Sequence, residues 1–410
     1  MEFHRNNSSP SSSNSSSMSA AGTPNPQKTD DPMHSWWESV SKARSRIHSL
    51  ATILPNSHSS ALSSLADSER PALSLLSSLA AYSAVSSSLS GSQSDPLCHW
   101  LYDTFLSSDP HLRLVVLSFL PLLSGLYLSR LHHRHDDNNH HDPPSLSGFE
   151  AVLLALYAAE TKSRNGKPLI ATVPDLSLPS IYHSPLRKPQ NSNANAPSSV
   201  AVISPPLEPL LAVKSTKRAS IVGAALQSYF SQISHMPSWS KLEFCRFLAG
   251  WAGQDCPCRR DLDRVPSNTL TLTLDDDGDG GGSNGGCDRE IEIESVGEMM
   301  GKVQIHDSDG LAKGDRIPLP WEILQPALRI LGHCLFAPLN PQEVKDAASF
   351  AVRCLYARAS HDLVPQAILA TRSLIQLDNR ARDAAKVAAA ATNPNTPTKV
   401  KKPEILLVSK

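Results

Sequence analysis

The sequence has few of the residues that build large cores or strong surface fields. Phe, Trp and Tyr make up 5% of its 410 residues, and apolar residues make up 40%. A chain of this length could form two or three domains, but this composition indicates that only part of it is packed. The formal charge is -1 and the isoelectric point is near 7.0, so no general field attracts nucleic acid. We therefore exclude a basic nucleic-acid-binding protein.

Cysteine is also sparse, and the segment up to Pro32 has no apolar stretch. The seven cysteines are an odd number and thinly spread, which is typical of a reducing, intracellular compartment. Residues 1–32 are rich in Ser, Asn and Pro and lack the apolar centre of a secretory signal. Glu2 stands where N-myristoylation requires glycine. We expect this leader to stay outside the fold.

Only one long apolar run is present, from Leu114 to Ser129. Arg113 and Arg130 flank it, and Pro121 interrupts it. Its length falls short of the ~20 apolar residues that cross a bilayer. We therefore predict a buried core helix, kinked at Pro121, in a soluble or peripheral membrane protein.

Low-complexity segments separate the apolar parts of the chain. None of them can bury enough apolar surface to offset the entropy of ordering, so each predicts a loop or a disordered end. We predict one helical domain at 33–378, with flexible loops near 132–145, 184–200 and 275–288. A disordered Ser-rich leader at 1–32 precedes it. An Ala-rich helix end and a disordered basic tail at 379–410 follow it.

Between these segments, apolar residues recur at helical spacing. Leu97, Leu101 and Phe105 form one such face, and residues 321–377 indicate three consecutive helices with short joints, which favour antiparallel neighbours. Another face consists of Ile221, Ala225, Tyr229 and Ile233. Strand-like patterns occur only at 169–173 and 269–274. The fold class that we predict is mainly α, an irregular stack of antiparallel helices with a small β element and long disordered loops and termini.

Four pairs of residues carry the chemistry of a helix start. Asp or Asn before Pro is typical of an N-cap with proline at the first helical position, and Ser three residues before Glu is typical of a capping box. The pairs are Asp109 with Pro110, Asn340 with Pro341, Ser147 with Glu150, and Ser240 with Glu243. We predict that helices begin at these positions.

Three polar clusters imitate metal sites without a full set of ligands. Asp275, Asp277, Asp279 and Gly280 resemble the start of a calcium loop, but Gly286 stands where a bidentate acid is required. Cys256 and Cys258 have CxC spacing, and Cys245 provides no second pair for tetrahedral zinc. The histidines from His132 to His141 lie in a low-complexity run. We predict solvated loops and structural thiols, with no metal and no cofactor.

Enzyme motifs are missing from the sequence. It contains no GxSxG elbow, HExxH pair, phosphate loop or kinase signature. We therefore predict that the protein is not an enzyme. A serine hydrolase hidden among the many serines is a rival hypothesis, and it requires a pocket in which a histidine of perturbed pKa lies beside a serine.

Two groups of residues have the chemistry of binding sites. Trp36 and Trp37 either anchor a partner protein, as aromatic hot spots do, or cap the core of the first helix, and both interpretations stay open. Basic residues could meet anionic lipid, at about 1 kcal/mol for each charge near the surface. They are Lys214, Lys217 and Arg218, and in the tail Lys399, Lys401, Lys402 and Lys410. Solvated linkers are the favoured interpretation, and a self-sufficient anionic-lipid-binding module is an alternative function.

Specific strings of residues resemble the hyccin family. The first group is Pro96-Leu97-Cys98-His99, Leu101-Tyr102, Phe119-Leu120-Pro121 and Leu126-Tyr127-Leu128. The second is Glu150-Ala151, Leu153-Leu154 and Tyr157, followed by Val173-Pro174-Asp175-Leu176-Ser177 and Pro179-Ser180-Ile181-Tyr182-His183. A weaker likeness continues to about Leu377. The Ser-rich leader, the His/Asp insertion, the Asp/Gly tract and the shorter tail resemble the plant-type branch of the family.

The resemblance implies a non-catalytic adaptor in the cytosol and at the cytoplasmic face of the plasma membrane. Such a subunit binds a tetratricopeptide-repeat scaffold and helps to recruit phosphatidylinositol 4-kinase III alpha, which supports the synthesis of phosphatidylinositol 4-phosphate. A palmitoylated membrane-anchor protein completes the implied assembly. The family has no catalytic residues. The signature residues that we expect mostly in the core are Leu101, Tyr102, Phe119, Leu120, Pro121, Glu150, Leu153, Tyr157, Pro174, Tyr182 and His183.

Overall fold

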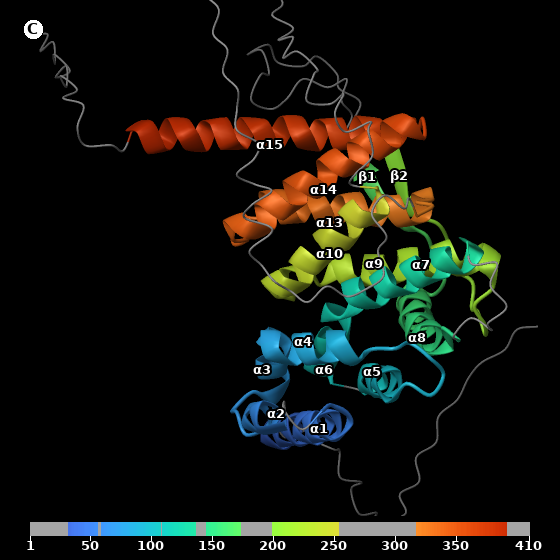
Figure 1. Cartoon of the computed structure of the whole chain (residues 1–410), viewed down its shortest axis with the longest axis vertical. Helices are drawn as coiled ribbons and strands as arrows, with labels where there is room; N and C mark the ends of the chain where they lie inside the picture. Colours follow the sequence, from blue (N-terminus) through green and yellow to red (C-terminus); the bar gives the residue numbers. More distant parts are fainter. Residues whose placement is uncertain are drawn as a thin grey trace, which may run out of the picture.

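Helices stack in layers from α1 at one end of the molecule to α15 at the other (Figure 1). The computed structural model describes residues 32–55, 59–107, 109–136, 145–173, 199–253 and 317–391. Several sequence predictions lie outside these residues. They are the Ser-rich leader, the strand at 269–274, the Asp/Gly tract, Cys256 and Cys258, and the basic tail.

The first layers contain six helices that surround one apolar core. They are α1 (Pro32–Ile53), α2 (Ser59–Ala66), α3 (Pro71–Ser77), α4 (Leu79–Ser88), α5 (Pro96–Leu106) and α6 (Pro110–Ser118). The predicted apolar face of α5 is confirmed, because Leu97, Leu101 and Phe105 are buried. The predicted cap of α6 is confirmed as well. One carboxylate oxygen of Asp109 accepts a hydrogen bond of 2.9 Å from the backbone N–H of Leu112.

The long apolar run forms two helices that meet at Phe119. The second is α7 (Leu120–Asp136), and the break falls two residues before Pro121, whose missing N–H interrupts the hydrogen-bond ladder. The stretch from Pro110 to His132 is long and apolar enough to cross a membrane, but 83% of its most apolar window is buried inside the fold. It is the core element that the sequence predicted. The loop predicted from residue 132 begins too early, because α7 continues to Asp136.

Two predicted capping boxes are wrong. The middle layers consist of α8 (Ser147–Ser163), α9 (Arg218–Ser231) and α10 (Ser238–Trp251), with short 3-10 turns at Ser215–Lys217 and Ile233–His235. α8 and α10 begin without a side-chain cap, and Ser147 and Ser240 lie inside them. The Ser147 hydroxyl is hydrogen-bonded to Ser145, whereas Glu150 and Ser240 bond to residues of other helices. The hydroxyl of Ser240 donates a hydrogen bond of 2.7 Å to the carbonyl of Ser118 at the end of α6.

The three predicted C-terminal helices are confirmed as α13 (Trp321–Phe336), α14 (Gln342–His361) and α15 (Pro365–Ala391). The predicted cap at their first joint is wrong, because α14 begins after Pro341. Asn340 instead donates hydrogen bonds of 2.9 and 3.0 Å to the carbonyls of His333 and Cys334. It therefore closes the end of α13. The Ala-rich segment predicted from residue 379 is the second half of α15, which projects beyond α14 (Figure 1).

A two-stranded antiparallel sheet lies toward the α15 end of the stack (Figure 1). Its strands are β1 (Leu169–Val173), which the sequence predicts, and β2 (Ser199–Ser204). Ile170 pairs with Val202, and Thr172 pairs with Val200. β2 is a correction, because its first residues fall in the loop predicted near 184–200. The fold class is mainly α with this small β element, as predicted.

Candidate functional site

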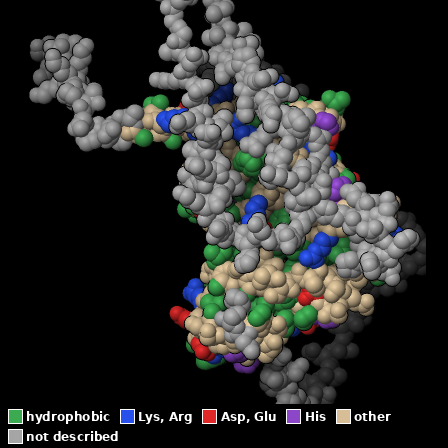
Figure 2. Space-filling view, viewed as in Figure 1, with side chains coloured by type: hydrophobic (Ala, Val, Ile, Leu, Met, Phe, Trp, Pro, Cys, Tyr) green, Lys and Arg blue, Asp and Glu red, His purple; other side chains and the backbone are tan. Residues whose placement is uncertain are grey.

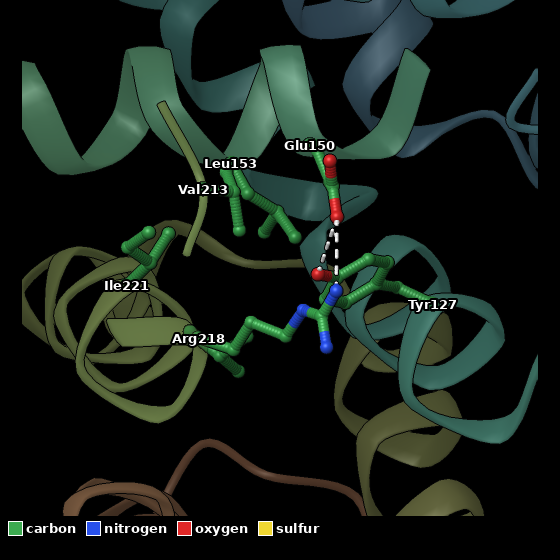
Figure 3. A pocket seen from close by; sticks show the side chains of 7 residues that line it. Tyr127, Glu150, Leu153, Val213, Arg218 and Ile221 are labelled. Atoms are coloured by element: carbon green, nitrogen blue, oxygen red, sulfur yellow. Dashed lines mark hydrogen bonds and ion pairs between the residues drawn. The ribbon is translucent and has the colours of Figure 1, made fainter. Parts of the chain in front are cut away.

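A small recess lies between α7, α8 and α9 (Figure 3). The Tyr127 hydroxyl donates a hydrogen bond of 3.0 Å to Oε1 of Glu150, and Nη2 of Arg218 lies 3.9 Å from the same oxygen. The apolar walls consist of Leu153, Val213, Ile221 and Val222. The empty space is about 150 Å³ and open to solvent, which is smaller than an ordinary ligand site.

The electrostatics of this recess favour a structural role. Burial raises the pKa of the Tyr127 phenol, and the negative charge of Glu150 raises it further. The phenol therefore stays protonated and acts as a donor. Glu150 accepts the hydrogen bond of the Tyr127 hydroxyl and faces Arg218, so the three side chains link α7, α8 and α9. The cluster presents neither an activated nucleophile nor a free base.

Trp36 and Trp37 lie in the first turns of α1, and both side chains are partly exposed. Their exposed fractions are 44% and 55%, and their ring centroids are 5.1 Å apart in an edge-to-face arrangement. About half of each side chain is therefore open to a partner, and the binding of a partner stays a prediction.

Exposed apolar residues of α5 lie at the same end of the molecule as this pair. The Ser39 hydroxyl donates to Asp109, and Nη1 of Arg46 lies 3.6 Å from Oδ2 of Asp103, so α1 and α5 run antiparallel. From the Ser39–Asp109 contact, Trp36 therefore lies beyond the end of α5, whereas Leu106 and Tyr102 lie along α5 in the other direction, toward Arg46. We name the N-terminal apolar patch for Met33, Trp36, Trp37, Tyr102 and Leu106, which are all exposed. Figure 2 shows hydrophobic side chains at the surface of this end.

Sites for metal or nucleophilic chemistry do not appear among the described residues. No group of three or more His, Cys, Asp or Glu side chains there could hold a metal ion. The hydrogen bond that the Cys245 thiol makes to Cys334, together with burial, raises the pKa of Cys245, so this thiol stays protonated in the core. A second recess of about 180 Å³ has no histidine in its walls, which consist of Ala61, Leu62, Leu65, Ser78, Ala80 and Ala81. Neither recess fits the hydrolase hypothesis.

Comparison with known families gives a match over most of the sequence. The sequence model of the Hyccin family matches residues 66–405. The chain belongs to the hyccin family. The match begins at the last residue of α2 and includes every later helix and both strands. α1, with its two tryptophans, precedes the matched residues.

Most of the described hyccin signature residues lie in the core. Leu101, Phe119, Leu120, Pro121, Leu153 and Tyr157 are buried. Tyr102 corrects the expectation, because 37% of it is exposed on the outer face of α5. Glu150 is half-buried and bonded in the recess. Pro174, Tyr182 and His183 lie outside the described residues.

The basic residues near α9 differ from the patch that the sequence suggested. Nζ of Lys217 lies 3.7 Å from Oε2 of Glu208, and Arg218 faces Glu150. Of Lys214, Lys217 and Arg218, only Lys214 has no carboxylate partner among the described residues. Sequence reasoning also missed Met33 and Leu106 as members of the N-terminal apolar patch. Met33 and Trp37 are four residues apart, and this helical spacing was the signal that could have placed Met33 on the same face as Trp37.

Proposed function

We propose that this chain is a non-catalytic adaptor subunit of a phosphatidylinositol 4-kinase complex. In this role it binds a tetratricopeptide-repeat scaffold and helps to hold phosphatidylinositol 4-kinase III alpha at the cytoplasmic face of the plasma membrane. The observation that carries the proposal is the match to the Hyccin family over residues 66–405. A palmitoylated anchor protein is the further partner in this assembly, and the chain itself associates peripherally with the membrane.

The N-terminal apolar patch supports a contact with a protein partner. Aromatic residues dominate the binding energy of many interfaces, because they bury a large area at a small entropic cost. Trp36, Trp37 and Tyr102 provide three such side chains at one end of a rigid helical stack. A helical scaffold can accept them between its own helices. We assign this patch to the scaffold contact.

The chemistry of the described core supports a role without catalysis. The polar groups of the recess are bonded to one another, and its space is too small for an ordinary substrate. The described cysteines Cys98, Cys245, Cys334 and Cys354 are buried. The exposed side chains of such a protein can contribute binding energy to the assembly of a complex. A subunit that binds only the assembled complex stabilises it by mass action and so raises kinase occupancy at the membrane.

Co-expression with the scaffold tests this proposal. An obligate interface buries well over ~2,000 Å² and leaves the lone subunit poorly soluble. We expect the chain to be more soluble with the scaffold and to co-purify with it, and the kinase to co-purify from native cells. Equal solubility with and without the scaffold, together with no co-purification, would contradict the adaptor function.

A further inference from the structure

The sheet β1–β2 presents an apolar face that no described helix covers. Side chains alternate across a strand, so Ile170 and its partner Val202 lie on the same face as Val200. Their exposed fractions lie between 56% and 63%. Such a face on an isolated two-stranded sheet is unfavourable in water and indicates a contact surface.

A fourth exposed aliphatic side chain, Leu211, belongs to the segment that follows β2. Leu211 is 99% exposed, although the chain on both sides of it is held in place. Before it, the buried Leu207 donates a backbone hydrogen bond of 3.0 Å to Gly166, three residues ahead of β1. After it, Val213 packs in the wall of the recess. The fold therefore fixes the loop and presents Leu211 to the outside.

The segments that carry these aliphatic residues are rich in basic side chains. Between Thr161 and Val173 and between Ser199 and Lys217, the only acidic residue is Glu208. The basic residues there are Lys162, Arg164, Lys167, Lys214 and Lys217. Glu160 neutralises Arg164 at 2.6 Å, and Glu208 lies near Lys217. Lys162, Lys167 and Lys214 are exposed and have no carboxylate partner in the described part of the chain.

We propose that this surface contacts an anionic lipid bilayer, and we name it the hairpin corner. It consists of Ile170, Val200, Val202, Leu211, Lys162, Lys167 and Lys214. The aliphatic side chains enter the headgroup region, and the lysine ammonium groups approach lipid phosphates. The inference rests on the proposed adaptor function, which places this subunit at a membrane.

The composition of the hairpin corner favours a bilayer over a protein as its occupant. Protein interfaces are enriched in aromatic residues and arginine and depleted in lysine, whereas the free cations here are all lysines and the exposed apolar residues are all aliphatic. The N-terminal apolar patch, in contrast, is rich in aromatic side chains, as protein interfaces are. Figure 1 places the sheet toward the α15 end of the stack and α1 at the other end, so a scaffold on α1 leaves the hairpin corner accessible.

Three charges give a weak contact that supplements protein anchoring. A lysine near an anionic surface changes the partition coefficient about fivefold, so three lysines together change it about 100-fold. A contact of this size orients a subunit that the scaffold already holds close to the membrane.

Vesicle sedimentation of the full chain bound to its scaffold tests the inference. Phosphatidylcholine vesicles with and without phosphatidylserine are the probes. We expect binding to the phosphatidylserine vesicles that weakens as salt rises, and a loss of about 100-fold in Lys162→Gln/Lys167→Gln/Lys214→Gln. Leu211→Ser should also weaken binding, because it removes an inserted side chain. The matched control, Lys42→Gln/Arg70→Gln/Arg113→Gln, removes equal charge from α1, α6 and the start of α3 and should bind within about twofold of the parent.

Co-purification with the scaffold separates the two proposals. The lysine variant and Leu211→Ser should keep scaffold binding while they lose vesicle binding. Equal vesicle binding by the parent, the lysine variant and the control would overturn the hairpin corner and leave the adaptor function intact. Loss of the scaffold from the lysine variant would also overturn it, because the surface would then be a protein contact.

Discussion

Gly223 in α9 lies directly against the carbonyl oxygen of Glu322 in α13. A β-carbon built on Gly223 would stand 2.3 Å from that oxygen, well inside van der Waals contact. Pro326 is four residues after Glu322 and has no N–H to bond this carbonyl within the helix. The glycine and the proline together allow α9 and α13 to approach closely.

Gly223→Ala should destabilise the fold by about 1–3 kcal/mol. The added methyl group meets backbone, which cannot rotate away, so the two helices must separate. Urea unfolding measures the loss. Gly332→Ala is a matched control in α13, because its β-carbon would meet only Leu374 at 3.7 Å, an ordinary contact. That variant should be neutral or up to about 1 kcal/mol more stable, since alanine favours helix. Equal stability of the two variants would contradict the close approach.

Asn340→Ala should cost about 3 kcal/mol at neutral pH. Nζ of the buried Lys241 donates a hydrogen bond of 2.8 Å to Oδ1 of Asn340, and the amide group of Asn340 binds two carbonyls at the end of α13. Alanine removes every one of these bonds. Lys241→Met in the Asn340→Ala background should recover part of the loss, because it removes the stranded charge. Additive effects of the two substitutions in a double-mutant cycle would contradict this coupling.

The penalty of Asn340→Ala should shrink as pH rises. Burial lowers the pKa of Lys241 in the folded state. The unfolded chain therefore binds more protons between this lowered pKa and the ordinary lysine value near ~10.4, and the stability of the folded state increases with pH across that window. Unfolding at neutral pH and at about pH 9 measures the slope. Asn340→Ala should show a steeper rise than Asn340→Ala/Lys241→Met.

Asp95→Asn should weaken the fold at neutral pH by about 1–3 kcal/mol. Burial raises the pKa of Asp95, but hydrogen bonds from the backbone N–H groups of Gly91, Leu97 and Ser90 outweigh it and hold this pKa below its ordinary value. The stabilisation is therefore present above the ordinary Asp pKa near ~3.9 and is lost as pH falls through the folded value.

Unfolding measurements at decreasing pH test whether the pKa of Asp95 is lowered in the folded state. The gap between the parent and Asp95→Asn should be constant above about pH 5 and should close in stronger acid. The control is Asp67→Asn, on the exposed chain after α2, and it should leave the stability at neutral pH within about 0.5 kcal/mol of the parent. A gap that widens in acid would contradict the lowered pKa.

Trp36→Ala/Trp37→Ala should reduce scaffold co-purification without loss of stability. Interface hot spots contribute about 2 kcal/mol or more, which is at least a 30-fold weaker complex for one residue. Because both rings are exposed, the unfolding free energy of the isolated chain should change by less than about 0.5 kcal/mol. Trp321→Ala, another exposed tryptophan at the start of α13, is the matched control and should keep the scaffold. Equal co-purification of all three proteins would contradict the assignment of the N-terminal apolar patch.

The helices and the core could be predicted from the sequence because both depend on local periodicity. Leu97, Leu101 and Phe105 share one face of any helix that includes them, and Asp109 before Pro110 fixes a cap within one turn. Asn340 carries a similar signal, but its side chain closes the preceding helix instead. The local sequence pattern does not indicate which helix end lies within hydrogen-bond distance of the Asn340 side chain.

The contacts between helices could not be predicted in the same way. Glu150 and Ser240 fit capping boxes, yet their side chains reach Tyr127 and Ser118 on other helices. The second strand was missed because its sequence follows a long Pro- and Ser-rich segment, and its pairing with β1 is a non-local contact. Exposure of the N-terminal apolar patch and of Leu211 likewise depends on which neighbours the fold supplies.

The break at Phe119 also affects how the chain must be made. The apolar helices α6 and α7 leave the ribosome long before α9 and α10, which cover them. Ser240, whose hydroxyl donates a hydrogen bond to the carbonyl of Ser118, lies 122 residues after Ser118 in the sequence. At translation rates of about 5–20 residues per second, the apolar surface of α6 and α7 stays exposed for on the order of ten seconds before α10 is synthesised. A chaperone that shields nascent chains should therefore bind this segment, and premature stop codons before α10 should yield aggregates.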